Sequence, residues 1–322
     1  IGYPTVYSSQ KRLLRTEWEA ALLTVAMREQ DIRKQVAETF YALLYLKEKK
    51  KLLMESDSLY AEFLEKAALR LAKGETSVLE KAAAGAQREQ IRLQLDQLQE
   101  DVATQQIRLG YLLGANKNYE PTSASPRARL SVRLDTFAVA ELPASRWMEQ
   151  QIIRAGAVTK NEQAKLLPGL TVGMYRQTFV GYQLVDGQDR YFGNNQFFGS
   201  VMAGITLPIF SAGQYQRVRV AKLDETIARS KYDATRQLLT SKRAAACNAY
   251  NRYLRAVQYY EATGLQNAAT ITTAANAQYR GGYINYMEWV LLINQAIAIR
   301  NEYTEALRQL NDATLTLNYF TN

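Results

Sequence analysis

Residues that commonly carry out chemistry are scarce in this chain. The sequence has no histidine, which removes the commonest general base, the usual zinc ligand and every serine or cysteine catalytic triad. Cys247 is the single cysteine, so an internal disulfide and a CxxC site are excluded. Its alanine-rich surroundings, residues 244–249, are typical of a helix and predict a small, buried packing residue.

The acidic residues do not supply a catalytic site either. They are spread over helical stretches, and nothing in their spacing orders two carboxylates into a pair. The sequence also has no glycine-rich loop of the kind that binds phosphate. We therefore expect a protein that is not an enzyme and that needs no cofactor or metal.

The chain is basic, with 40 Lys and Arg residues against 31 Asp and Glu residues, a net charge of +9. Such a balance fits nucleic acid, an anionic membrane surface or acidic substrates, but it is also common on long solvated helices, which we favour. The basic residues are interspersed with acidic ones and lack a Gly-rich or aromatic platform, so we expect no nucleic-acid partner.

The chain carries neither a transmembrane helix nor a targeting segment in its sequence. No stretch reaches the ~18 to 20 continuous apolar residues that a membrane-spanning helix needs, and no signal peptide opens the chain. The first residues, Ile1 to Pro4, resemble the interior of a longer sequence. We expect the natural N-terminus to lie upstream of them.

An internal repeat organises the chain. Residues 1–10 resemble residues 205–214, with Pro4 and Pro208 lying 204 positions apart. Further on, Gly74 and Gly282 lie 208 positions apart, and the same offset relates two apolar seams that step by four and three residues, as in a coiled coil. The seams are Ile91, Leu95, Leu98, Val102, Gln105, Leu109 and Leu112 in the first half, and Ile299, Tyr303, Ala306, Leu310, Ala313, Leu317 and Phe320 in the second.

Each half is predicted to be an antiparallel helical hairpin. In the first half a helix runs over residues 8–73, which at ~1.5 Å per residue is roughly 100 Å long, and a shorter helix returns to residue 114 after a turn at residues 73–77. In the second half the long helix covers residues 212–280, and the return ends near residue 320 after a turn at residues 281–285. Helices of this length must bury their apolar flanks against other long helices.

Between the halves the periodicity changes to that of strands. Residues 197–207 alternate between an apolar face and a smaller, more polar face, and Leu170, Val172 and Met174 alternate similarly in a partner strand. Residues 180–195 are rich in Gly, Asp, Asn, Gln and Tyr and are expected to form a solvated loop. A soluble hairpin would also alternate, but a hairpin between very long helices has little to pack on, so we favour a membrane strand pair. Its predicted lipid-facing residues are Phe197, Val201, Ala203, Ile205 and Leu207.

The order and duplication of these segments resemble the TolC family of outer-membrane efflux proteins over nearly the whole chain. The resemblance is carried by residues 167–170 (LPGL), 204–214 (GITLPIFSAGQ), 73–80 and 280–288, and residues 3–7 (YPTVY) are similar to members from heavy-metal efflux systems. It implies a mainly α fold with a small β part: long antiparallel helical hairpins form a trimeric α-barrel, and β-hairpins contribute to a shared transmembrane β-barrel.

The resemblance also implies a division of the chain into segments. Residues 1–7 would end the first strand pair, residues 8–117 would form the first helical hairpin, and residues 118–146 an irregular equatorial segment. Residues 147–167 would be an upper helix, residues 168–210 the β-hairpin, and residues 211–322 the second helical hairpin. An upper helix and a strand that precede residue 1 in the family would then lie upstream of this sequence.

Site residues follow from the same resemblance. The hairpin tips would dock a periplasmic adaptor, and residues near them would close the periplasmic end. The arginine of the family's closing network is replaced here by Ile284 and its second acidic position by Leu291, so Arg280 or Lys73 could substitute. Tight turns and solvated helix surfaces are the alternative interpretations. The tip residues are Lys73, Gly74, Glu75, Thr76, Ser77, Gly281, Gly282, Tyr283, Ile284 and Asn285, and the gate residues are Glu80, Tyr279 and Glu288.

The function implied by the resemblance is that of a passive exit duct. A homotrimer in the outer membrane of a Gram-negative bacterium would extend into the periplasm and conduct substrates, heavy-metal ions among them, that an inner-membrane RND pump delivers through the adaptor. The alternative is a soluble coiled-coil scaffold with no transport role, which would need no detergent and form no heat-modifiable trimer.

Overall fold

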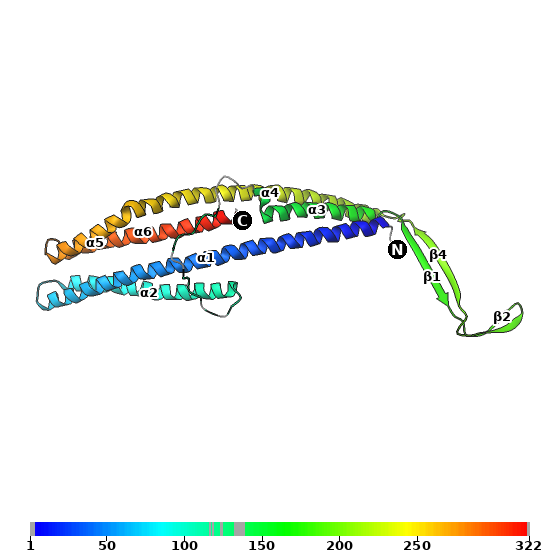
Figure 1. Cartoon of the computed structure of the whole chain (residues 1–322), viewed down its shortest axis with the longest axis horizontal. Coiled ribbons are helices and arrows are strands. Elements are labelled where there is room, and N and C mark those ends of the chain that lie inside the picture. Colours follow the sequence, from blue (N-terminus) through cyan, green and yellow to red (C-terminus); the bar gives the residue numbers. More distant parts are fainter. Residues whose placement is uncertain (1–3, 116, 118, 123–124, 132–138, 321–322) are drawn as a thin grey trace. The chain divides into compact units, whose positions relative to one another are not determined.

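The computed structural model describes residues 4–115, 117, 119–122, 125–131 and 139–320 (Figure 1). The chain divides into two compact units, each of which is described by itself. One comprises residues 1–26 and 143–237, and the other residues 27–142 and 238–322. Most described residues are helical and a small part is strand, which confirms the predicted fold class. No helix among the described residues is long and apolar enough to cross a bilayer.

The larger unit consists of two helical hairpins. In the first, the later part of α1 (Pro4–Ala72) is followed by α2 (Val78–Leu112); in the second, the end of α4 (Ala212–Tyr259) continues through a π-helical turn (Tyr260–Gly264) into α5 (Leu265–Arg280), and α6 (Tyr286–Tyr319) returns. Figure 1 shows α2 running back along α1, and α6 back along α5 and α4. This arrangement confirms the two hairpins predicted from the repeat.

The coiled-coil seams form much of the core of this unit. In α2 the buried seam positions are Ile91, Leu98 and Leu109, and in α6 Leu310 and Leu317 are almost completely buried. One continuous apolar cluster includes residues of α1, α2, α5 and α6, so the two hairpins pack on each other near their tips. Burial of such a seam stabilises helices that would be marginal alone.

The smaller unit joins three helices to the strands. α3 (Pro143–Ala164) lies beside the start of α1 and the start of α4, and polar contacts connect them. Gln150 donates to the carbonyl of Thr16 at 3.1 Å, and Gln214 donates to the carbonyl of Glu162 at 2.8 Å. A short 3₁₀ turn, Val139–Glu141, precedes α3 in the chain. The expected upper helix, residues 147–167, thus starts four residues earlier and ends three residues earlier than predicted.

The start of α1 corrects one prediction. Residues 1–7 were expected to end a strand, whereas α1 already begins at Pro4; residues 1–3 lie outside the described residues. Proline is favoured in the first helical turn because its fixed φ suits the helix and its missing N–H would have no partner there. The hydroxyls of Ser8 and Ser9 also donate to the carbonyls of Thr5 and Val6, which helical geometry brings within 3.0 Å.

Two antiparallel strand pairs follow α3. β1 (Gly169–Gln177) pairs with β4 (Phe198–Thr206), and the register places Leu170, Val172 and Met174 opposite Ile205, Ala203 and Val201. Cross-strand partners share a face of the sheet, so the two alternating patterns form one apolar face. Phe197 and Leu207 flank β4 and lie outside the strand.

The predicted solvated loop holds the second strand pair. β2 (Gly181–Val185) and β3 (Gln188–Phe192) form a hairpin within residues 180–195. Its two-residue turn consists of Asp186 and Gly187, which have positive φ angles of 52° and 79°. An Asp-Gly pair is a strong hairpin signal because both positions of a type I′ turn need positive φ. Composition alone had pointed to a loop, and this local signal outweighs it.

A π-helical turn interrupts the predicted long helix of residues 212–280. Gly264 ends the turn, and the Tyr260 ring lies so close to it that a β-carbon there would approach Cδ1 of the ring to 2.8 Å. The Tyr260 hydroxyl donates to Glu302 in α6 at 2.8 Å, and the Tyr303 hydroxyl donates to Glu261 at 3.3 Å. Two reciprocal tyrosine–glutamate bonds therefore hold the turn on α6.

Candidate functional site

Both hairpin tips end their long helix in the same way. Gly74 and Gly282 each have a φ of +74°, a left-handed conformation that favours glycine. The next residue donates its N–H to a carbonyl five residues back, Glu75 to Arg70 and Tyr283 to Gln278, each at 2.9 Å. Together with the Gly N–H bonds to Leu71 and Tyr279, this is a Schellman motif in each tip. The repeat thus extends to backbone geometry.

The tips differ at the start of the returning helix. In the second tip Asn285 and Glu288 form a capping box: the Glu288 N–H donates to Asn285 at 3.0 Å, and the Asn285 N–H donates to the Glu288 carboxylate at 2.8 Å. In the first tip Ser77 makes no side-chain cap bond, so Glu80, which occupies the position equivalent to Glu288, is available for other partners. Glu288 is exposed, and its contact is with its own helix end.

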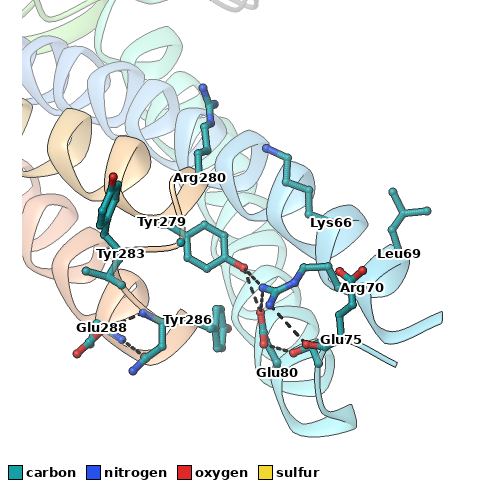
Figure 2. A pocket seen from close by; sticks show the side chains of 14 residues that line it. Lys66, Leu69, Arg70, Glu75, Glu80, Tyr279, Arg280, Tyr283, Tyr286 and Glu288 are labelled. Atoms are coloured by element: carbon teal, nitrogen blue, oxygen red, sulfur yellow. Dashed lines mark hydrogen bonds and ion pairs between the residues drawn. The ribbon is translucent and has the colours of Figure 1, made fainter. Parts of the chain in front are cut away.

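Glu80 is the centre of a polar network that joins the two tips (Figure 2). Its side chain is 12% exposed, and its carboxylate accepts hydrogen bonds from the Tyr279 hydroxyl at 3.1 Å and from the Thr76 hydroxyl. The Arg70 guanidinium donates to the Tyr279 hydroxyl at 2.9 Å and forms an ion pair with Glu80 at 3.5 Å. The network contains the Glu80–Tyr279 pair expected from the resemblance.

Arg70 is the residue that the sequence interpretation missed. Arg280 and Lys73 were the expected substitutes for the missing arginine, but Arg280 pairs with Glu62 at 3.5 Å and Lys73 is exposed on the tip. Ile284 lies half-buried against the apolar cluster. An antiparallel hairpin that turns around Glu75 brings the residues five before and five after it together, and this simple symmetry would have identified Arg70.

Two tyrosines beside Glu80 keep their protons. Burial, followed by the Glu80 carboxylate, raises the pKa of Tyr279, and Arg70 opposes this effect. Burial and the same carboxylate raise the pKa of Tyr286 to about 12. Tyr279 therefore remains a hydrogen-bond donor to Glu80 throughout the physiological pH range.

A cluster of aromatic rings packs against Tyr279, a member of this network. The Phe63 ring of α1 lies parallel to those of Tyr286 and Trp289 in α6, with centroids 4.5 and 4.7 Å away, and the Tyr279 ring is 5.5 Å from it. The Trp289 N–H donates to Asn276 at 2.9 Å, so its polar edge is satisfied. Buried rings of this kind have few alternative positions, and they fix the side from which Tyr279 reaches Glu80.

An open cleft of about 920 Å³ lies over the network. Its lining includes Arg70, Glu80 and Tyr279 together with tip residues of both hairpins, and it is of mixed polarity (Figure 2). Large apolar side chains are exposed near it at both tips, namely Leu69, Val78, Leu79, Tyr283, Met287 and Leu291. Two adjacent hairpin ends thus present an apolar rim around a polar centre.

The expected lipid-facing residues lie on an uncovered sheet face. Every residue of β4 is exposed, and Val201 and Ile205 have exposed fractions of 78% and 71%. Ala203 lies between them on the same face, opposite Val172. Phe197 and Leu207 are exposed at the two ends of the strand.

The described residues show little that resembles a reaction centre. They contain no group of three or more His, Cys, Asp or Glu side chains that could hold a metal ion. Cys247 is half-buried in α4, which is more exposed than predicted, because the alanine-rich helix face around it is only partly covered. The polar network at the tips can hold two hairpins together and exchange hydrogen bonds.

Comparisons with known proteins agree with this structure. The sequence model of the outer membrane efflux protein family matches residues 140–322, more than half of the chain. The cobalt-zinc-cadmium resistance protein CzcC of Cupriavidus metallidurans is 25% identical over 310 residues, which cover 93% of this chain and 69% of CzcC.

Solved structures share the fold. A membrane protein from Pseudomonas aeruginosa superposes with a TM-score of 0.84 at 17% identity, covering 98% of this chain and 74% of the other. The outer membrane protein VceC from Vibrio cholerae gives 0.80 at 18% identity, covering 98% and 75%. Together with the family match, the duplicated hairpins, their shared tips and the exposed strand pair lead to one conclusion: the chain belongs to the outer membrane efflux protein family, the TolC family, and is an outer-membrane efflux channel protein.

Proposed function

We propose that three copies of this chain form the exit duct of a tripartite efflux system, which receives its cargo from an inner-membrane RND pump through a periplasmic adaptor. The duct is passive and catalyses no reaction. The main observation behind the proposal is the uncovered apolar face of the β1–β4 sheet. A compact soluble protein rarely exposes a continuous apolar surface of this kind.

The sheet needs both lipid and further strands. A two-stranded sheet is marginal in water, and in a bilayer its free edges would leave backbone N–H and C=O groups without partners. Strands from other copies would satisfy these edges and close a barrel, while Val201, Ala203 and Ile205 would face the outer-membrane lipid. Phe197 and Leu207 would lie near the borders of the apolar band.

Exposed helix faces support a homotrimer. On the first part of α1, Leu14, Trp18, Leu22 and Val25 are more than half exposed and follow each other at steps of four, four and three residues. On α4, Val220, Leu223 and Ile227 step by three and four residues and are also exposed. Such stripes are typical of helices that pack against another helix of the same kind, so neighbouring copies would cover them.

The hairpin tips would carry docking and gating. Residues 73–77 and 281–285 would dock the adaptor, with the exposed Val78, Leu79 and Met287 as apolar contacts. The Glu80–Tyr279 bond would hold the tips in the closed arrangement. Glu288 would keep the second tip folded through its cap, in addition to its expected position in the gate.

The cargo proposal rests on the similarity to CzcC, whose name describes cobalt, zinc and cadmium resistance. We propose that divalent heavy-metal ions pass through the duct. They would need no binding site in it, because the pump supplies both the selection and the energy.

The duct can be tested with two variants at adjacent positions of β4. The full-length protein, purified in detergent, should run as a heat-modifiable trimer and conduct ions in planar bilayers. Val201→Arg places a charge on the proposed lipid face at a cost of about 2–4 kcal/mol near the bilayer centre. Ser200→Arg places it on the opposite face and should be tolerated. Equal recovery of both variants as membrane-inserted trimers, or no conductance from the parent protein, would contradict the proposal.

The cargo can be tested separately in cells that lack their own metal exporter. Co-expression with the adaptor and pump should restore growth in zinc, cobalt or cadmium. If the channel conducts in bilayers but the complete system protects against none of these ions, the proposal of an exit duct is supported and the proposal of a metal cargo is refuted.

A further inference from the structure

We infer that Arg70 is the positioning residue of the gate: its guanidinium holds Glu80 and Tyr279 together, so that one chain contains every member of the latch between its two hairpin tips. The inference rests on the proposed function, in which these tips close the duct. Neither the family resemblance nor the repeat assigns a role to Arg70.

The contacts of Arg70 reach three parts of the site. Its Nη1 atom donates to the Tyr279 hydroxyl at 2.9 Å and lies 3.5 Å from Oε1 of Glu80, and its Nη2 atom lies 3.5 Å from the Glu75 carbonyl. Glu75 belongs to the turn, Glu80 to α2 and Tyr279 to α5. One planar side chain thus connects both tips, and the fixed fork of a guanidinium suits several acceptors at once.

Burial makes this cation necessary. The Glu80 side chain is only 12% exposed, and a charge in such a place is costly unless it is paired. Among the ion pairs of the described part of the chain, Arg70 is the partner of Glu80. Without it, the cost of desolvating the unpaired charge would favour Glu80 turning out toward water and away from Tyr279.

The other charged groups around the cleft have different partners. Lys66 of α1 and Arg280 of α5 both pair with Glu62, and Glu288 of α6 caps its own helix. Tyr286 of α6 is buried beside Glu80 and keeps its proton because its pKa is about 12. Glu75 contributes its carbonyl to Arg70. Arg70 is therefore the cation that the geometry directs to Glu80.

Three variants distinguish a charge-based latch from simple packing, with single-channel conductance in planar bilayers as the readout. Arg70→Gln should raise the open fraction at neutral pH by roughly tenfold, as expected for one lost charged hydrogen bond. Arg70→Lys should open the channel less than Arg70→Gln, because the ammonium keeps the positive charge near Glu80 but loses the fork that also reaches Tyr279 and the Glu75 carbonyl. Arg70→Gln combined with Glu80→Gln should return toward the parent, because the amide that replaces the carboxylate carries no charge and its oxygen can still accept from Tyr279.

The inference is overturned if Arg70→Gln changes neither the conductance nor the distance between the two tips, or if the double variant is as open as the single one, since a packing role would not be rescued by removing the second charge.

Spin labels separate this inference from the proposed function. Labels on Ser77→Cys and Tyr283→Cys, in a Cys247→Ser background diluted with unlabelled chains, report the distance between the two tips of one chain. If Arg70→Gln broadens the distribution of this distance but leaves conductance unchanged, Arg70 holds the two tips together as inferred, but the tips do not gate the duct. If Tyr279→Phe opens the channel while Arg70→Gln changes neither readout, the gate stands and Arg70 is not its positioning residue.

Discussion

Replacing Phe63 by alanine should loosen the contact between the two hairpins. Phe63 is 3% exposed and lies in α1, while the rings stacked on it, Tyr286 and Trp289, belong to α6. The substitution removes the ring from between hairpins that are more than 200 residues apart in the sequence, and it leaves the helical hydrogen bonds of α1 in place. The effect should therefore appear in the packing of α6 on α1.

The expected cost follows from the burial of the ring. Truncating a fully buried Phe to Ala costs about 3–5 kcal/mol, through lost transfer free energy and the cavity that remains. The cost for Phe63 should lie toward the upper end of this range, because its ring is nearly parallel to two others and each such aromatic pair contributes about 0.5–1.5 kcal/mol beyond its buried area. The rigid helices on both sides limit the collapse that would lower the cost.

Hydrogen exchange of the detergent-solubilised protein measures this cost locally, in the part of α6 that packs on Phe63. Backbone amides in the first hydrogen-bonded turns of α6, residues 289–293, should exchange roughly a hundredfold faster or more, since each 1.4 kcal/mol is a factor of ten. Leu69→Ala is the matched control on the same helix, because Leu69 is 59% exposed and should change exchange little. An increase below about fivefold for Phe63→Ala, or an equal increase for Leu69→Ala, would refute the stacking argument.

Two further predictions concern other contacts of the larger unit. The Arg308 hydrogen bond lowers the pKa of Glu305 to about 2, so Glu305 should contribute stability above pH ~4.5 that disappears as pH falls toward ~2. Its 42% exposure limits this to about 1 kcal/mol, and Glu305→Gln should abolish that part of the acid dependence of the thermal midpoint. Gly264→Ala should cost about 1–3 kcal/mol in thermal unfolding, because its methyl group collides with the Tyr260 ring. Gly213→Ala, where the methyl group meets open space, should not destabilise; equal losses would contradict this reasoning.

Much of the fold could be predicted because its signals are local or periodic. The seams of residues 91–112 and 299–320 fix which face of each returning helix is buried, and this was confirmed at Ile91, Leu98 and Leu310. Gly74 and Gly282 mark the turns because both adopt positive φ. The alternation in residues 197–207 predicted one strand, and the alternation at Leu170, Val172 and Met174 predicted its partner strand.

Local signals also caused the errors. At residues 180–195 polar composition outweighed the Asp186–Gly187 turn signal, and a hairpin was missed. At the start of the chain, similarity to residues 205–214 suggested a strand, whereas Pro4 opens a helix. The π-turn at Tyr260–Gly264 has no periodic signature, because a single added residue per turn only shifts the phase of the apolar pattern.

The sequence by itself determined the class of protein: two coiled-coil hairpins with glycine tips and a strand pair with one apolar face, in a chain with no histidine and one cysteine. Only the tertiary structure decided that Arg70, rather than Arg280 or Lys73, reaches Glu80, and that Phe63 packs against both Tyr286 and Trp289. Periodicity fixes which face of a helix is buried. The contacts between two hairpins also depend on the rotation and height of each helix, which come from packing all four together.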